Sequence, residues 1–155
     1  VEIVTAGLLI IGDEILSGRT KDKNIGFIAD YLTAIGIDLR EVRVVGDLED
    51  EIIAALNALR TKFTYVFTTG GIGPTHDDIT ADCIAKAFGV PINQRPDVVE
   101  KFREKFGDEN LTEARLRMTR IPDGARLVPS ELVVAPGFWT GNVIVMARIP
   151  RITNQ

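Results

Sequence analysis

One stretch of the chain reads Thr68-Thr69-Gly70-Gly71-Ile72-Gly73-Pro74-Thr75-His76-Asp77-Asp78-Ile79-Thr80. The residues just before it, 65–67, are aromatic and β-branched, which is typical of a short buried strand. After it, apolar residues recur at helical spacing from Ile79 to Phe88, and Gly89 offers a helix stop. The stretch is therefore predicted to be a glycine turn between a strand and a helix.

The glycines of this turn favour a phosphate-binding site. Glycine lets backbone N–H groups approach a ligand closely, and a helix N-terminus adds partial positive charge. The turn is not a Walker A motif, because no Lys lies between Gly70 and Asp82. It is not a dinucleotide fingerprint either, because His76 stands where a glycine is needed.

Two adjacent carboxylates, Asp77 and Asp78, take the place of a cation in this turn. Two like charges ~4 Å apart repel by ~4 kcal/mol at an effective dielectric constant of ~20, whereas a helix terminus returns only ~0.3–1 kcal/mol. We infer that a Mg²⁺-like ion, a shared proton or a positively charged ligand neutralises them. A local alternative is that Asp78 caps the helix starting at Ile79, with Thr75 and Asp77 shaping the turn.

The rest of the chain predicts an α/β fold. Residues 1–11 have the composition of a strand covered on both faces, and 37–45 alternate as a second strand. Helices are expected over 25–35 and 48–59. Three strand–helix alternations imply parallel crossovers, so we expect one domain over 1–155: a three-layer α/β/α arrangement with a mostly parallel sheet.

Beyond Gly89 the pattern changes. Helices are expected near Pro96 and over 111–118, and strands near 132–135 and 143–146 as an antiparallel hairpin at the sheet edge. Arg115, Arg117 and Arg120 form either a solvated face or a contact for an anionic ligand.

Acidic residues follow each of the first three predicted strands. Asp13 and Glu14 follow the first, Asp47 the second, and the 70–78 turn the third. Because ligands bind at the carboxyl ends of parallel strands, we expect these groups on one rim. Asp47 alone also fits an N-cap of the helix that follows it.

Composition restricts the class of protein. An apolar content of 45% and a charged content of 26% are ordinary for a soluble globular domain. A net charge of −4 argues against nucleic acid as a partner. The single cysteine, Cys83, excludes an internal disulfide and is expected in the core. No apolar run is long enough for a membrane span and no basic leader precedes the first strand, so a cytoplasmic location is expected.

Several motifs together resemble a known family, the molybdopterin-binding fold of molybdenum-cofactor biosynthesis, and in particular the amino-terminal domain of CinA competence/damage-inducible proteins. The matching stretches cover nearly the whole chain in order. They are Gly12-Asp13-Glu14-Ile15-Leu16-Ser17-Gly18 with Asn24, Val45-Gly46-Asp47, Thr68 to Thr80, Met118 with Pro122-Asp123-Gly124-Ala125, and Ala135-Pro136-Gly137-Phe138.

The resemblance implies an α/β/α domain that binds a pterin or nucleotide at the strand-end rim. Asp47 and Asp78 match aspartates that are functionally important in adenylyltransferase-like members. Homo-oligomers are common in the family. The implied ligand-binding residues are Gly12, Asp13, Glu14, Ser17, Gly70, Gly71, Ile72, Gly73, Pro74, Thr75, His76, Asp77 and Thr80.

The resemblance is incomplete at the carboxyl end. Family members usually carry a Pro-Gly-Val/Gln-Pro loop and a helix there, but residues 146–150 read Met-Ala-Arg-Ile-Pro and match only at Pro150. We therefore expect a domain truncated at its carboxyl end.

Two functions follow from these residues. One is a binding module for molybdopterin or an adenine nucleotide. The other is a metal-dependent ADP-ribose pyrophosphatase, as CinA-type domains imply, or a molybdopterin adenylyltransferase-like enzyme. In either case Asp13, Asp47 and Asp78 are predicted to hold Mg²⁺, and amides from Gly71 to Gly73 to stabilise phosphate charge. A purely structural domain leaves the glycines and acids unexplained.

Overall fold

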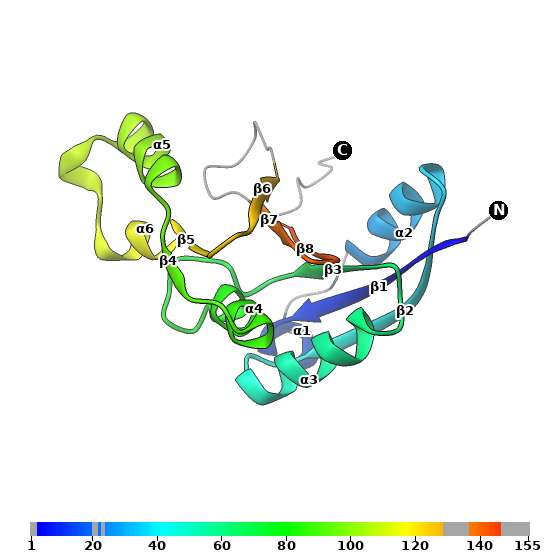
Figure 1. Cartoon of the computed structure of the whole chain (residues 1–155). Coiled ribbons are helices and arrows are strands. Elements are labelled where there is room, and N and C mark those ends of the chain that lie inside the picture. The colour runs from blue at the N-terminus through cyan, green and yellow to red at the C-terminus, as the bar shows by residue number, and fades with distance from the viewer. Residues whose placement is uncertain (1–2, 20–21, 23, 129–136, 147–155) are drawn as a thin grey trace, which may run out of the picture.

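A computed structural model describes residues 3–19, 22, 24–128 and 137–146 of the chain (Figure 1). In order along the chain, the elements are β1 (Val4–Ile11), α1 (Asp13–Leu16), α2 (Asn24–Ala34), β2 (Ile37–Val45), α3 (Glu49–Arg60), β3 (Tyr65–Thr69), α4 (Thr80–Phe88), β4 (Ile92–Gln94), α5 (Pro96–Phe106), the 3₁₀ turn η1 (Asp108–Asn110), α6 (Glu113–Arg117), β5 (Arg120–Pro122), β6 (Arg126–Val128), β7 (Gly137–Thr140) and β8 (Val143–Val145).

The main sheet has six strands in the order β2-β1-β3-β8-β7-β6. Strands β2, β1, β3 and β8 are parallel to one another, whereas β7 pairs antiparallel with both β8 and β6. The predicted fold class is thus confirmed: a mostly parallel sheet with an antiparallel part at one edge. A separate antiparallel pair, β4-β5, was not predicted.

Helices cover both faces of the sheet, and β1 shows why (Figure 1). Its alternate residues Ala6, Leu8 and Ile10 share one core cluster with side chains of α2. Leu9 and Ile11 belong to a second cluster that includes side chains of α3 and α4. A strand buried on both faces needs this unbroken apolar run. The helices therefore form two layers with the sheet between them.

The second strand of the predicted carboxyl-terminal hairpin is confirmed as β8, whereas its antiparallel partner β7 lies in the stretch that was predicted to connect the two strands. Gly137–Thr140 is itself a strand, and it turns at 141–142 into β8. Phe138 is buried while Trp139 is exposed, which is the alternation that a strand requires. The predicted strand at 132–135 lies outside the described residues.

The segment from β4 to β5 forms a small lobe beside the main sheet, with α5 and α6 standing apart from α2 and α3 (Figure 1). Pro96 occupies the first turn of α5, as predicted. Val98, Phe102 and Ile121 are buried in the same cluster as Leu9 and Val66 of the main sheet. The lobe and the sheet therefore share one core.

Cys83 is buried in that core, as predicted. Burial raises the pKa of its thiol to about 12, so the group acts as a small apolar side chain. Within the described ranges, no helix is both long and apolar enough to cross a bilayer.

Candidate functional site

The carboxyl ends of the first three strands lie side by side at one edge of the sheet. There the connection after β1 and the connection after β2 pass over opposite faces of the sheet. β1 lies between β2 and β3, with α2 on one face and α3 on the other. The N–H of Gly12 donates to the Val45 carbonyl at 2.9 Å. A Cβ on Gly70 would stand 2.0 Å from the Ile11 carbonyl oxygen, so only glycine lets the end of β3 press against β1 here. Ligands of α/β sheets bind at such switch points.

Asp13 and Asp47 are joined by two reciprocal hydrogen bonds, each from the backbone N–H of one residue to the carboxylate of the other. The Asp13 N–H donates to Oδ2 of Asp47 at 3.2 Å, and the Asp47 N–H donates to Oδ1 of Asp13 at 3.0 Å. Gly46 makes room for the pair, since a Cβ there would lie 2.4 Å from Asp13 Oδ1. The cap interpretation of Asp47 is wrong: α3 has Leu48 at its N-cap position and no side-chain cap.

Negative charge accumulates around Asp47. Burial raises the pKa of Asp47 above its usual value, and the hydrogen bond from the Asp13 N–H opposes that rise. The charges of Asp13, Glu14 and Asp78 raise the pKa of Asp47 further. Acids from all three predicted loops therefore act on one carboxyl, which favours a cation nearby.

The other predicted residues of the first loop contact residues that are near them in the sequence. The Glu14 carboxylate folds back over Gly12, where a Cβ would stand 2.4 Å from Glu14 Oε1. The exposed Ser17 hydroxyl donates to the Glu14 carbonyl at 3.3 Å and accepts from Nε of Arg19 at 3.1 Å. Gly12 and Glu14 thus lie beside Asp13, while Ser17 lies at the outer end of α1.

Thr80 fixes the base of the glycine turn. Its Oγ1 donates to the Gly70 carbonyl at 2.8 Å, and its N–H donates to the Gly71 carbonyl at 3.0 Å. Gly70 and Gly71 have φ of 91° and 70°, which favours glycine. A Cβ on Gly71 would also stand 2.1 Å from Thr80 Oγ1. Thr80 is fully buried, so it supports the turn from beneath.

The backbone N–H groups of Gly71, Ile72 and Gly73 form no hydrogen bond with any other described residue. All three residues are half-buried, and the Ile72 side chain packs against the core. A half-buried N–H needs a partner, protein or otherwise. Three such donors in sequence are what an anion requires.

The second half of the turn closes on itself. Asp78 Oδ2 accepts from the Thr75 N–H at 3.0 Å and from Thr75 Oγ1 at 2.9 Å. The cap interpretation of Asp78 is therefore wrong, and Ile79 occupies the N-cap position of α4. The side chains of His76 and Asp77 are 92% and 81% exposed and pair at 3.5 Å. Pro74 is exposed as well.

The three predicted metal ligands do not form a ready-made cage. Among the described residues, no three His, Cys, Asp or Glu side chains form a group able to hold a metal ion. The Asp13–Asp47 pair remains, and Mg²⁺ is commonly held by one or two carboxylates together with phosphate oxygens.

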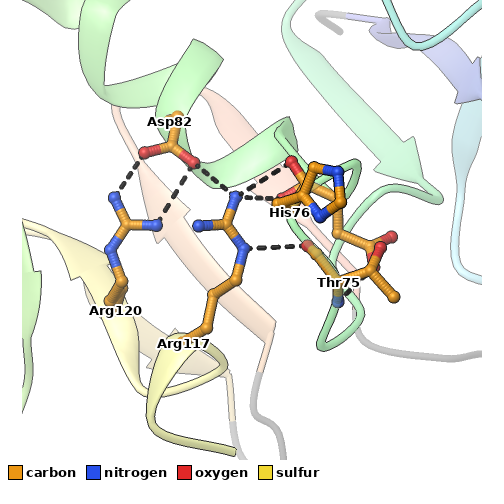
Figure 2. A network of polar contacts seen from close by, with 6 residues as sticks. Thr75, His76, Asp82, Arg117 and Arg120 are labelled. Atoms are coloured by element: carbon orange, nitrogen blue, oxygen red, sulfur yellow. Dashed lines mark hydrogen bonds and ion pairs between the residues drawn. The ribbon is translucent and has the colours of Figure 1, made fainter. Parts of the chain in front are cut away.

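Arg117 of α6 holds the turn from the small lobe (Figure 2). Its Nε donates to the Thr75 carbonyl at 2.8 Å, and its Nη2 donates to the Asp78 carbonyl at 3.0 Å. The sequence left Arg117 between a solvated face and a ligand contact. Its side chain is 25% exposed and bonds to the turn, so the solvated face is wrong, and the ligand contact stays a prediction. Its partners lie 39 to 42 residues away along the chain, beyond any local pattern.

Asp82, in the first turn of α4, joins Arg117 to Arg120 (Figure 2). Both guanidinium side chains are only 25% exposed, so they do not form a solvated face. A cavity of about 30 Å³ lies among these side chains and Gly71 and Gly73. It has room for water but not for a nucleotide.

The family of probable molybdopterin binding domains matches residues 7–150 of the chain. The chain belongs to this family. A crystal structure of the protein CinA, of unknown function, from Thermoplasma acidophilum is similar at a TM-score of 0.83 and 35% identity, over 91% of this chain and 86% of that one. The resemblance found in the sequence is thereby confirmed.

Curated proteins are also similar to this chain in sequence. A protein of Metallosphaera sedula is 36% identical over 96% of this chain and 59% of its own length. A protein of Pyrobaculum calidifontis is 35% identical over 95% and 58% respectively. The chain thus spans less than two thirds of these proteins. The tungsten cofactor synthesizing protein MoaB from Pyrococcus furiosus, at 21% identity and a TM-score of 0.57 over 94% of this chain and 82% of that one, shares the fold.

Proposed function

We propose that this domain binds a phosphate-bearing pterin or adenine nucleotide at the rim formed by the ends of β1, β2 and β3, together with Mg²⁺. The observation that carries this proposal is that two kinds of group share one rim. The N–H groups of Gly71, Ile72 and Gly73 make no hydrogen bond in the described part of the chain, and the acids around Asp47 lie close enough to raise its pKa.

The residues at this rim fit a magnesium ion that arrives with phosphate. Asp13 and Asp47 would hold it, because each is fixed by the other's N–H. Hard oxygen ligands suit Mg²⁺. The ion would offset the repulsion between these carboxylates and a phosphate group. Asp78 would act on the ion at longer range while shaping the turn.

Calorimetric titration with ADP-ribose tests this proposal. We expect Mg²⁺ to strengthen binding at least tenfold, about 1.4 kcal/mol, and Asp13→Asn to remove that gain. Asp38→Asn is the matched control, since Asp38 lies at the start of β2, the end of the strand away from the rim, where its exposed side chain pairs with Arg40 at 2.8 Å. Equal affinity with and without Mg²⁺ would count against the metal.

The raised pKa of Asp47 favours a second candidate, a pyrophosphatase. A carboxyl whose pKa is raised by burial and by neighbouring acids suits general-base chemistry. Asp47 would accept a proton from water as the water oxygen bonds to phosphorus. The phosphorus–oxygen bridge would break, giving AMP and ribose 5-phosphate. An adenylyltransferase-like reaction would instead join AMP from ATP to a pterin and release pyrophosphate.

AMP release from ADP-ribose separates the enzyme from the binding module. If the domain is a pyrophosphatase, Asp47→Asn lowers turnover by roughly 10²–10⁴-fold, as loss of a general base does. Binding without turnover in the wild type identifies the module. A homo-oligomeric state, also expected, is checked by sedimentation of the same sample.

A further inference from the structure

A second and larger hollow lies beside the glycine turn, with a volume of about 400 Å³. Its walls come from the turn and from the small lobe, which are distant in the chain: Pro74 of the turn, Phe102 and Phe106 of α5, and Thr112, Ala114, Arg115 and Met118 in and around α6. Its volume is in the range of small-molecule sites, roughly 300–1,000 Å³. This hollow was not predicted from the sequence.

The hollow lies next to the candidate site. Pro74 lies next to Gly73, whose N–H makes no hydrogen bond with another residue that the structure describes. Met118 lines both the hollow and the small cavity beside Gly71 and Gly73. A ligand held by its phosphate at the turn could therefore extend past Pro74 into the hollow.

The walls suit a flat aromatic group. The Arg115 guanidinium lies over the Phe106 ring, with Cζ 4.0 Å from the ring centroid, and its Nη1 donates to the Asn110 carbonyl at 2.9 Å. Phe102 packs against Phe106 edge to face, with ring centroids 5.9 Å apart. Arginine planes and aromatic rings stack with heterocycles, and methionine adapts to their edges. Only one formal charge, that of Arg115, lies among the lining side chains.

We propose that this hollow receives the fused heterocycle of the ligand, a purine or a pterin, while the glycine turn receives its phosphate. This inference rests on the proposed function and extends it. The hollow would then recognise the ring. A phosphate compound without a ring would bind more weakly, and the difference in affinity would equal the contribution of stacking.

Four probes and two variants test the inference by titration. ADP is compared with pyrophosphate, and neopterin monophosphate with inorganic phosphate, all with Mg²⁺. Ala114→Trp fills the hollow. Glu113→Trp is the matched control, since Glu113 is the preceding residue of α6, is exposed and lines neither space. Circular dichroism verifies that both variants fold.

In the wild type we expect at least one ring-bearing compound to bind about 5- to 150-fold more tightly than its ring-free counterpart, the range that base stacking on aromatic side chains gives. Whichever compound shows the gain identifies the ring as purine or pterin. Ala114→Trp should abolish this gain and leave the ring-free compound within about twofold, whereas Glu113→Trp should keep both affinities.

A ring advantage that survives in Ala114→Trp would overturn the inference and leave the proposed function standing. If none of the four probes binds the wild type, the proposed function fails and the inference fails with it. If Ala114→Trp changes the sedimentation coefficient while the ring advantage is kept, the hollow is an interface between copies, and the inference is again overturned.

Discussion

Asp47 lies where burial and three neighbouring acids all disfavour its charge. A carboxyl whose pKa is raised on folding contributes stability that is fully present below its unfolded pKa. That contribution is lost as pH rises through the folded pKa. At pH values above the folded pKa, ionised Asp47 therefore lowers the stability of the fold. A cation bound with the ligand would offset the repulsion between Asp47 and the neighbouring carboxylates.

We predict that Asp47→Asn raises the free energy of unfolding at about pH 7 and changes it little at about pH 3, where aspartates are protonated. The asparagine Oδ1 can still accept from the Asp13 N–H, so the loop keeps its hydrogen bond. Urea unfolding at the two pH values measures this. A variant less stable than the wild type at pH 7 would contradict it, and Asp77→Asn should be neutral at both.

Thr80 shows a different role for a single side chain at the site. Removing its buried hydroxyl in Thr80→Val leaves the Gly70 carbonyl without its donor at 2.8 Å. We expect unfolding to become easier by about 1–3 kcal/mol, measured by urea denaturation. Thr112→Val, at the N-cap of the short α6, serves as an exposed comparison and should change stability less. Equal losses would argue against a special role for Thr80.

At the scale of elements, the glycine turn is held by α6 as well as by its own strand and helix. Arg117 bridges two carbonyls of the turn with a planar guanidinium. A lysine carries the same charge, but its single ammonium group lacks the planar, divergent N–H donors with which the guanidinium reaches both carbonyls. A change in the small lobe that removes these hydrogen bonds is therefore expected to loosen the turn as well.

We predict that Arg117→Lys speeds amide hydrogen exchange over residues 72–79 by roughly 5- to 150-fold, equivalent to about 1–3 kcal/mol for hydrogen bonds from a charged donor. The control is Arg103→Lys, which alters an exposed ion pair of α5 with Glu100 and Asp108. Unchanged exchange in Arg117→Lys would mean that the turn keeps its shape without the lobe.

The elements also show what a sequence can predict. The bounds of β2 and the glycine stop after α4 follow from local patterns, and both are as expected. The carboxylates of Asp47 and Asp78 were misassigned as caps in the local alternative, because a cap and a turn use the same residue types. The Arg117 contacts and the hollow depend on segments that meet only after folding, so no local pattern contained them.

At the scale of the whole molecule, the small lobe and the main sheet share one core cluster. Phe102 of α5 is 1% exposed and belongs to the same cluster as Val66 of β3. Elements that share a core unfold together in a small domain. The site lies between the two parts, so this shared core fixes its geometry.

We predict that Phe102→Ala lowers the free energy of unfolding by about 3–5 kcal/mol in a single transition. Trp139 lies on β7 of the main sheet, so its fluorescence should report the same midpoint as far-ultraviolet circular dichroism. Two separate midpoints, with the fluorescence transition unmoved from wild type, would contradict a shared core.

We propose that acids, and backbone amides without a hydrogen-bond partner among the described residues, hold a phosphate-bearing ligand at one rim. Crystals soaked with ADP-ribose and Mn²⁺, a substitute for Mg²⁺ with an anomalous signal, test it directly. We predict an anomalous peak at the carboxylates of Asp13 and Asp47, with phosphate oxygens within hydrogen-bond distance of the N–H groups of Gly71 to Gly73. Ordered ADP-ribose whose phosphates lie away from both groups would contradict the claim.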